Sequence, residues 1–294
     1  MSARVTTFWR RRTLVTTIRF VVLVVFIIVM LFPLVWIVSG SLKPLAQVFE
    51  IPVRWIPDPI QWWNYPDAWG ISGQAEALNY HLTTNFNTNL INSLIVTGVQ
   101  VVIRVLLCSL AGYGFAKHNF PGKEILFILI LGMSLLPLQI IMVPLFVIVK
   151  QLGWINTYQG LILPTAIDAF AIFFMRQFIA SIPSDYVDAA RVDGASELGI
   201  FFRIIVPMSS PALVTLAVLA SLESWDAFLW PLIVVSDQKL ATLPLGIAYL
   251  KSLYQAPAHW LLAVAVIMAL PLLIIFIFAQ RRIIESAAQT GIKG

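Results

Sequence analysis

Charged residues are scarce in this sequence. Asp, Glu, Lys and Arg make up 11% of its 294 residues, against roughly 25% in a soluble domain. A soluble domain of this length keeps about a quarter of its unfolded surface in water, and this composition cannot supply the polar cover which that surface needs. The shortage of charge excludes an ordinary soluble protein, and the 60% hydrophobic content excludes a disordered chain.

Cysteine pairs and clustered basic residues are also lacking. A single cysteine, Cys108, excludes an intramolecular disulfide. The net charge of +5 would suit nucleic acid only if the basic residues gathered on one polar face, but they sit mainly between apolar runs. His81 and His118 have no companion ligands nearby, so we expect no metal and no other cofactor.

What the chain does have is a series of long charge-poor runs. Each is near the length of about 20 mostly apolar residues that a helix needs to cross a bilayer. An all-α integral membrane protein with six transmembrane helices is predicted. The predicted spans are residues 20–42, 89–116, 125–149, 158–179, 207–234 and 259–280. No A-x-A cleavage pattern follows the first run, so we interpret it as an uncleaved anchor.

The distribution of Lys and Arg predicts the orientation. With both termini in the cytoplasm, the segments on that side carry 13 basic residues and the outer segments carry five. This excess matches the positive-inside rule. Residues 1–19 and 281–294 are then cytoplasmic tails, and the protein is a multi-pass component of the bacterial cytoplasmic (inner) membrane.

The outer segment of residues 43–88 is rich in tryptophan and proline. Its tryptophans are Trp55, Trp62, Trp63 and Trp69, interspersed with five prolines. Tryptophan is enriched at membrane interfaces, and this favours an aromatic belt over direct contact with a ligand. We expect a short ordered cap on the outer face rather than a regular domain.

The polar stretch of residues 182–206, between the fourth and fifth spans, predicts a projecting elbow. Ser184 and Asp185 suit the start of a short helix that ends near Val192. Gly194 can adopt a positive φ and end the turn, and a second short helix starts at Ala195 or Ser196. An amphipathic connector on the lipid headgroups would be rich in Lys and Arg. The nearly balanced charges here favour a protein partner instead.

This stretch resembles the EAA loop of bacterial ABC-importer permeases. Asp188-Ala189-Ala190 stands at the E-A-A, Asp193-Gly194-Ala195 at the D-G-A, and Val206-Pro207 at the closing L-P. Asp replaces Glu at position 188 and Val replaces Leu at 206. The elements similar to carbohydrate permeases of the maltose-permease type extend along most of the chain. They are Ser39-Gly40-Ser41-Leu42-Lys43-Pro44, Asn92-Ser93, Ala111-Gly112-Tyr113, Phe120-Pro121-Gly122-Lys123, the segment from Trp225 to Leu232, Gln280-Arg281-Arg282 and the ending Gly291-Ile292-Lys293-Gly294.

The resemblance implies a type I importer fold with residues 89–280 as the permease core. It also implies three kinds of partner: a second homologous permease, two ATP-binding subunits and an extracytoplasmic binding protein that delivers a sugar. The chain lacks the G-x-x-x-x-G-K-[ST] phosphate loop, so ATP hydrolysis belongs to a partner chain and this chain is no enzyme. In the family the EAA loop docks on the ATPase. The residues assigned to this coupling are Asp185, Asp188, Ala189, Ala190, Asp193, Gly194 and Ala195.

Polar residues inside the spans are candidates for the substrate path. A charge at a helix centre costs about 2.5–3.5 kcal/mol, so it usually faces a cavity or a partner. The spacing of Glu223, Asp226, Ala227 and Trp230 predicts one shared helical face. A carboxylate beside tryptophan suits sugar binding. The alternative is a salt bridge or hydrogen bond that holds the two permeases together. For Asp226 both interpretations stay open, and for Glu223 the structural one is favoured. The candidates are Asp226, Trp225, Trp230, Glu223, Arg104 and Asp168.

Arg104 and Asp168 present a further choice, since they either form a buried ion pair or each face the path. Prolines within the spans predict helix kinks. Alternative functions are import of a polyol or a glycerol-phosphate-type solute by the same architecture, or ion-coupled secondary transport with Asp168, Glu223 and Asp226 as a proton relay. A membrane enzyme would need a convergent catalytic cluster, which the sequence does not show.

Overall fold

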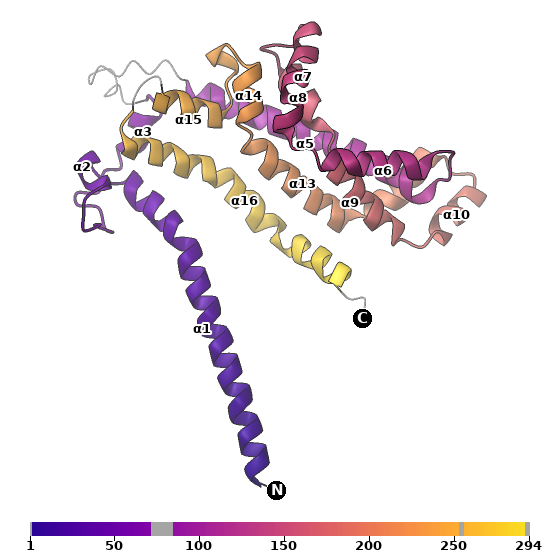
Figure 1. Cartoon of the computed structure of the whole chain (residues 1–294), viewed down its shortest axis with the longest axis horizontal. Coiled ribbons are helices and arrows are strands. Elements are labelled where there is room, and N and C mark those ends of the chain that lie inside the picture. The colour runs from indigo at the N-terminus through magenta and orange to yellow at the C-terminus, as the bar shows by residue number, and fades with distance from the viewer. Residues whose placement is uncertain (1, 72–84, 253–255, 292–294) are drawn as a thin grey trace. The chain divides into compact units, whose positions relative to one another are not determined.

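The computed structural model describes residues 2–71, 85–252 and 256–291 of the chain. These residues form helices joined by turns and irregular connections, which confirms the predicted all-α class (Figure 1). The chain divides into two compact units. The first is Met1–His81 with Tyr254–Ile267, and the second is Leu82–Leu253 with Met268–Gly294.

The first unit is built on the long helix α1. Its helices are α1 (Ser2–Ser41), α2 (Leu45–Val48), α3 (Asn64–Ala68) and the beginning of α16 (Ala258–Gly291). Side chains of residues 15–35 are exposed on every side of α1, although nearly all of them are apolar. A helix that is hydrophobic all round belongs in lipid or against another protein. Helix α1 also includes residues 2–19, ahead of the predicted first span. The bounds of that span stay a prediction.

The S-G-S-L-K-P element forms the joint at the end of α1. A Cβ on Gly40 would lie 2.6 Å from Cδ1 of Leu262, so a larger residue here would require the Leu262 side chain of α16 to move. The Asn64 side chain donates hydrogen bonds to the carbonyls of Ser41 and Lys43, each at 2.9 Å. Lys43 is fully buried, and burial lowers the pKa of its ammonium while the charge of Glu50 opposes that shift. The residues of this element therefore hold α3 and α16 on α1.

The structure describes the Trp/Pro-rich segment up to residue 71, and residues 72–84 lie outside the described residues. Short helices α2 and α3 stand at its two ends, with an irregular connection between them. Trp62 and Trp63 are two-thirds exposed, Trp55 is exposed, and Trp69 is half-buried. The expected position on the outer face stays a prediction.

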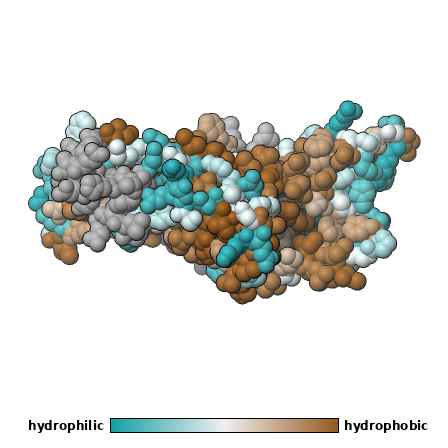
Figure 2. Space-filling view, turned by 90° about the horizontal axis from the view of Figure 1, so that it is seen from above, coloured by the Kyte–Doolittle hydropathy of each residue, from teal (hydrophilic) through white to brown (hydrophobic). Residues whose placement is uncertain are grey.

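The second unit contains the remaining helices. They are α5 (Phe86–Lys117), α6 (Lys123–Ser134), α7 (Leu138–Gln151), α8 (Tyr158–Ala166), α9 (Ala169–Ala180), α10 (Asp185–Val192), α11 (Glu197–Ile200), a π-helical turn (Phe201–Ile205), α12 (Val206–Met208), α13 (Ser210–Trp225), α14 (Leu229–Val234), a 3₁₀ turn (Gln238–Leu240), α15 (Leu243–Ser252) and the end of α16. Space-filling Figure 2 shows hydrophobic side chains over wide areas of the face in view, as a membrane protein requires.

Helix α5 is the centre of the second unit, since it packs along α9 and α13 and also contacts α8 and α15. The closest approach is at Gly112. A Cβ there would lie 2.8 Å from the backbone nitrogen of Arg176 and 2.8 Å from Cβ of Met175 on α9. Small residues at helix crossings allow such contacts within membranes.

Three of the predicted spans are broken rather than straight. The helix axis bends by 103° between α6 and α7, by 47° between α8 and α9, and by 83° between the segment Glu197–Met208 and α13. Pro137 precedes α7, where its missing N–H costs nothing. The predicted fifth span also breaks after Trp225, so α13 and α14 are separate helices.

Within the part of the chain that the structure describes, three single helices are long and apolar enough to cross a membrane: Val15–Ser41, Phe86–Lys117 and Ala258–Gln280. The number reaches six if each bent pair counts as one span. The six-span arrangement therefore stays a prediction.

Candidate functional site: a polar cavity and a projecting loop

A cavity of about 300 Å³ lies within the second unit, beside the break between α8 and α9 and the break between α13 and α14. Its wall combines apolar side chains with hydroxyl, amide and carboxylate groups. The polar residues of its lining are Gln100, Thr165, Glu223, Ser224, Asp226 and Thr242, and the aromatic ones are Phe228 and Trp230. The hydroxyl of Thr242 is buried and has no hydrogen-bond partner among the described residues. A mainly apolar pocket with a few placed polar groups is the usual form of a small-molecule site.

The break between α8 and α9 leaves backbone carbonyls that α5 satisfies. The side-chain nitrogen Nε2 of Gln100 donates to the Thr165 carbonyl at 2.9 Å and to its hydroxyl at 2.8 Å. Nη2 of Arg104 donates to the Thr165 carbonyl at 2.6 Å, and Nε donates to the Ala166 carbonyl at 3.3 Å. A cation at the C-terminal end of a helix is favourable. The break is thus held by two residues one turn apart on α5.

Arg104 also forms an ion pair with Glu223 of α13. The Arg104 side chain is 4% exposed, whereas that of Glu223 is 66% exposed. The suggested pairing of Arg104 with Asp168 is wrong. The Asp168 carboxylate instead caps α9, accepting a hydrogen bond from the backbone nitrogen of Ala171 at 2.8 Å.

The predicted single face of Glu223, Asp226, Ala227 and Trp230 is wrong, because α13 ends at Trp225 and α14 begins at Leu229. The four residues nevertheless all line the cavity, since the break folds them toward it. Trp230 is 3% exposed, and its indole donates to the Gly160 carbonyl at 3.0 Å. Trp225 is outside the lining, and its indole donates to the Met268 carbonyl at 3.0 Å.

The sequence prediction lacked the uncharged polar residues of the lining, which are Gln100, Thr165, Ser224 and Thr242. Ser224 donates to Oε1 of Gln100 at 2.6 Å and to the Thr97 hydroxyl at 3.3 Å. Thr97, Gln100 and Arg104 recur three and four residues apart, which places them on one face of α5. This spacing can be read from the sequence, so it is the signal that would have placed Thr97 and Gln100 beside the charged Arg104.

The loop after α9 has the predicted elbow shape, with α10 at one end of the second unit in Figure 1. Gly194 has φ +80°, and its N–H donates to the Arg191 carbonyl at 3.0 Å to end α10. Ser196 then caps α11 by accepting from the backbone nitrogen of Gly199 at 3.2 Å. Ser184 precedes α10 as predicted but makes no side-chain cap; its hydroxyl accepts from Nζ of Lys117 at 3.3 Å.

Apolar residues fix the loop to the helices of the second unit. Val187, Ile200, Phe201 and Ile205 are at most 1% exposed and share one core with Tyr113, Met175 and Leu216. The outward side of α10 is left exposed and mixes acidic with apolar groups. Its exposed residues include Asp185, Tyr186, Asp188, Ala189, Val192 and Asp193. Hydrogen bonds to Glu197 raise the pKa of Arg191, so this guanidinium stays charged at any cellular pH.

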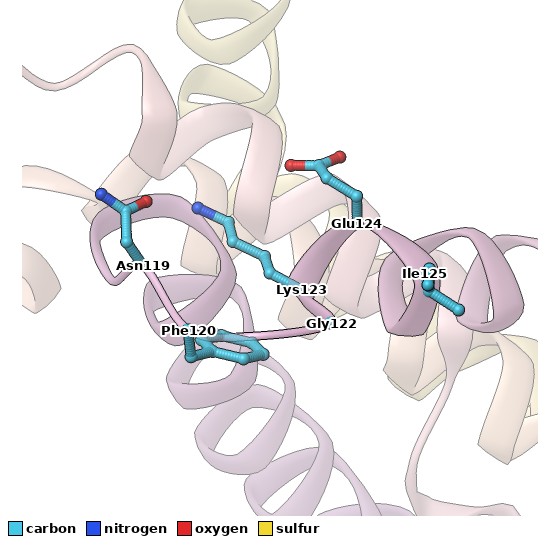
Figure 3. Close-up of a pocket in the computed structure, with 6 residues that line it drawn as sticks. All are labelled: Asn119, Phe120, Gly122, Lys123, Glu124 and Ile125. Carbon is cyan, nitrogen blue, oxygen red and sulfur yellow. The ribbon is translucent and has the colours of Figure 1, made fainter.

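A second hollow, of about 400 Å³, lies at the turn between α5 and α6. Figure 3 shows Asn119, Lys123 and Glu124 extending to one side of the turn, with Phe120 and Ile125 apart from them. Nζ of Lys123 donates to the His118 carbonyl at 2.8 Å. The two opposite charges are adjacent, so the hollow favours neither an anion nor a cation.

Comparison with known proteins identifies the family. Residues 104–288 match the model of the binding-protein-dependent transport system inner membrane component. The chain belongs to this family. It is therefore a permease subunit of an ABC importer and a multi-pass protein of the inner membrane, as predicted.

Two relatives match over nearly the whole chain. The arabinooligosaccharides transport system permease protein AraQ of Bacillus subtilis is 36% identical over 266 residues, which cover 90% of this chain and 91% of the relative. The sn-glycerol-3-phosphate transport system permease protein UgpE of Yersinia pestis is 30% identical over 266 residues, which cover 89% and 92%.

A solved structure shares the fold. It is the crystal structure of a bacterial ABC transporter involved in the import of the acidic polysaccharide alginate. One of its chains superimposes with a TM-score of 0.76 at 23% identity, covering 92% of this permease and 97% of that chain. The permease fold is thereby confirmed.

The two candidate partners of Arg104 can be separated by mutation. Arg104→Lys should lower the free energy of unfolding by about 1–3 kcal/mol, because one ammonium cannot serve both carbonyls and Glu223 in the fixed geometry of a guanidinium. Asp168→Asn should change it by less than about 0.5 kcal/mol, because asparagine caps a helix equally well. Denaturant unfolding of the purified protein in detergent measures both. Equal losses for the two variants would contradict the assignment of Glu223 as the partner.

Proposed function

We propose that this permease forms half of the translocation pathway of an ATP-driven importer for an uncharged sugar. Its partners are a second homologous permease, two ATP-binding subunits and an extracytoplasmic binding protein. The chain spans the membrane six times with both termini in the cytoplasm, and it hydrolyses no ATP itself. Support for a sugar comes from the relative AraQ, which is named for arabinooligosaccharides.

The observation that carries the coupling role is the construction of α10. Val187 anchors this helix in the core of the second unit, while its outer side stays exposed and acidic. Asp185, Asp188 and Asp193 can then meet basic groups on an ATPase, and the small Ala189, Ala190 and Ala195 allow close approach in a groove. Gly194 sets the elbow that presents the helix.

The observation that favours an uncharged solute is the chemistry of the cavity. Glu223 and Asp226 both line it, and among the described lining residues there is no Lys or Arg. Arg104 directs its charge to Glu223 and to backbone carbonyls. An anionic solute would want free guanidinium or ammonium groups. Hydroxyl groups of a sugar suit the Asp226 carboxylate and the free hydroxyl of Thr242, and the ring of Phe228 suits its C–H faces.

The second candidate is a glycerol-phosphate-type solute, favoured by the relative UgpE. The lining argues against it, since the Asp226 carboxylate would repel a phosphate and the charge of Arg104 is already paired with Glu223. A binding assay of the assembled importer with arabinooligosaccharide and with glycerol 3-phosphate separates the two candidates.

Gly194→Ala tests the coupling loop. Alanine at φ +80° costs about 1–2 kcal/mol of backbone strain, so we expect about a tenfold weaker association with the ATPase subunits. Gly153→Ala is the matched control, because Gly153 also has a positive φ and open space around it but lies in the turn after α7. Co-purification of ATPase with each variant is the measurement. Equal effects of the two substitutions on ATPase co-purification would contradict a role of the loop in coupling.

Asp226→Ala tests the cavity. Among the described residues the Asp226 carboxylate accepts no hydrogen bond, so its loss should leave assembly and thermal stability unchanged. A carboxylate that bonds a sugar hydroxyl contributes about 1.5–3 kcal/mol, so half-maximal uptake should need about ten times more solute. Asp237→Ala, at an exposed cap outside the cavity, is the control. Loss of assembly in Asp226→Ala would instead assign this residue to the contact between permeases.

A further inference from the structure

One carboxylate connects the projecting loop to the central helix of the second unit. Glu197 is the first residue of α11, just beyond the Gly194 elbow. Its Oε1 accepts from Nε of Arg191 at 2.7 Å, and its Oε2 lies 3.3 Å from Nη2 of the same guanidinium. The Tyr113 hydroxyl donates to Oε2 at 2.7 Å, and Nε2 of His118 lies 3.2 Å from it.

The groups that meet at Glu197 come from different elements. Arg191 belongs to the last turn of α10 and also contacts Asp188 at 3.2 Å. Tyr113 is near the end of α5 and is 3% exposed, and His118 ends that helix. The Tyr113 ring packs beside His118 and Phe201, with centroids 5.1 and 5.7 Å away. A two-point bond to a guanidinium fixes the relative orientation of both groups. Glu197 therefore joins α10 to α5 through directional bonds.

Helix α5 continues from this junction to the cavity. Tyr113 and Arg104 are nine residues apart on the same uninterrupted helix, which corresponds to about 13 Å along its axis. Arg104 holds the break between α8 and α9 and pairs with Glu223 of α13. One continuous helix therefore carries both Tyr113 at the loop and Arg104 beside the cavity.

The polar junction is not what holds the fold together. The Glu197 side chain is 46% exposed, and exposed ion pairs contribute little to stability. The loop is kept in place by the buried residues Val187, Ile200 and Phe201. Removing the Glu197 charge should therefore leave the loop folded while loosening its directional connection to α5.

We propose that Glu197, which lies outside both the D-A-A and D-G-A motifs, is a positioning residue that passes movement of α10 to α5 during transport. This inference rests on the proposed docking of α10 to an ATPase. The junction couples the two elements because a single carboxylate is shared between Arg191 on one and Tyr113 on the other.

The test uses the complete importer in proteoliposomes, with its binding protein, ATP inside and arabinooligosaccharide as the probe. Glu197→Gln keeps the shape of the side chain but loses its charge and one acceptor oxygen. We expect normal co-purification of the ATPases and continued ATP hydrolysis. The number of solute molecules imported per ATP should fall about fivefold or more, since fivefold is the lower end of the usual coupling between two sites. A purely structural role would lower uptake and hydrolysis together and leave this ratio unchanged.

Two further variants test whether the effect depends on the bond between Glu197 and Tyr113. Tyr113→Phe keeps the buried ring but removes the hydroxyl bond, so it should lower the same ratio, and combining it with Glu197→Gln should add little. Glu124→Gln is the matched control, since this exposed carboxylate on α6 has no ion pair among the described residues.

The outcomes separate the two proposals. An unchanged import ratio in Glu197→Gln, with the wild-type complex active, overturns the positioning role alone. Loss of ATPase from Glu197→Gln, with Tyr113→Phe normal, also overturns it, because Glu197 would then act in docking. Failure of the wild-type permease to bind any ATPase overturns the proposed function and the positioning role together.

Discussion

A polar group inside a bilayer needs a partner, and in this permease many of the partners come from a single helix. At breaks in the transmembrane helices, backbone carbonyls lose their usual donors, and water is absent to replace them. Gln100 and Arg104 of α5 satisfy those of Thr165 and Ala166. Gly112 of the same helix permits the close crossing with α9, and Tyr113 reaches the loop. The cavity and the loop thus both depend on how α5 is placed.

Features set by local chemistry could be predicted from the sequence. The elbow after α9 follows from a glycine that accepts a positive φ and a serine that caps the next helix, and neither needs distant contacts. The breaks after Ala166 and Trp225 could not be predicted, because a charged residue does not by itself mark a break: Asp168 and Asp226 lie beside breaks, whereas Arg104 lies inside the continuous helix α5. Whether Arg104 pairs with Glu223 or with Asp168 likewise depends on which helices lie next to each other. The hydrophobic pattern of a single helix does not predict its neighbours.

Acidic residues occur at both candidate functional sites, the cavity and the loop. The carboxylates at the cavity can accept hydrogen bonds from hydroxyl groups, and they disfavour an anionic solute. The carboxylates on α10 face outward, where a protein with basic groups can cover them. The exposed surface of α1 over residues 20–35 is apolar throughout, as expected for a helix that faces lipid.

The most direct test of the account asks which energy source drives transport. Proteoliposomes that contain this permease, its partner permease and the ATPases should accumulate labelled arabinooligosaccharide when binding protein is outside and ATP is inside. They should accumulate none under an imposed proton gradient without ATP. Accumulation driven by the gradient alone, in vesicles that lack any ATPase, would contradict the account and support a proton relay through the intramembrane carboxylates.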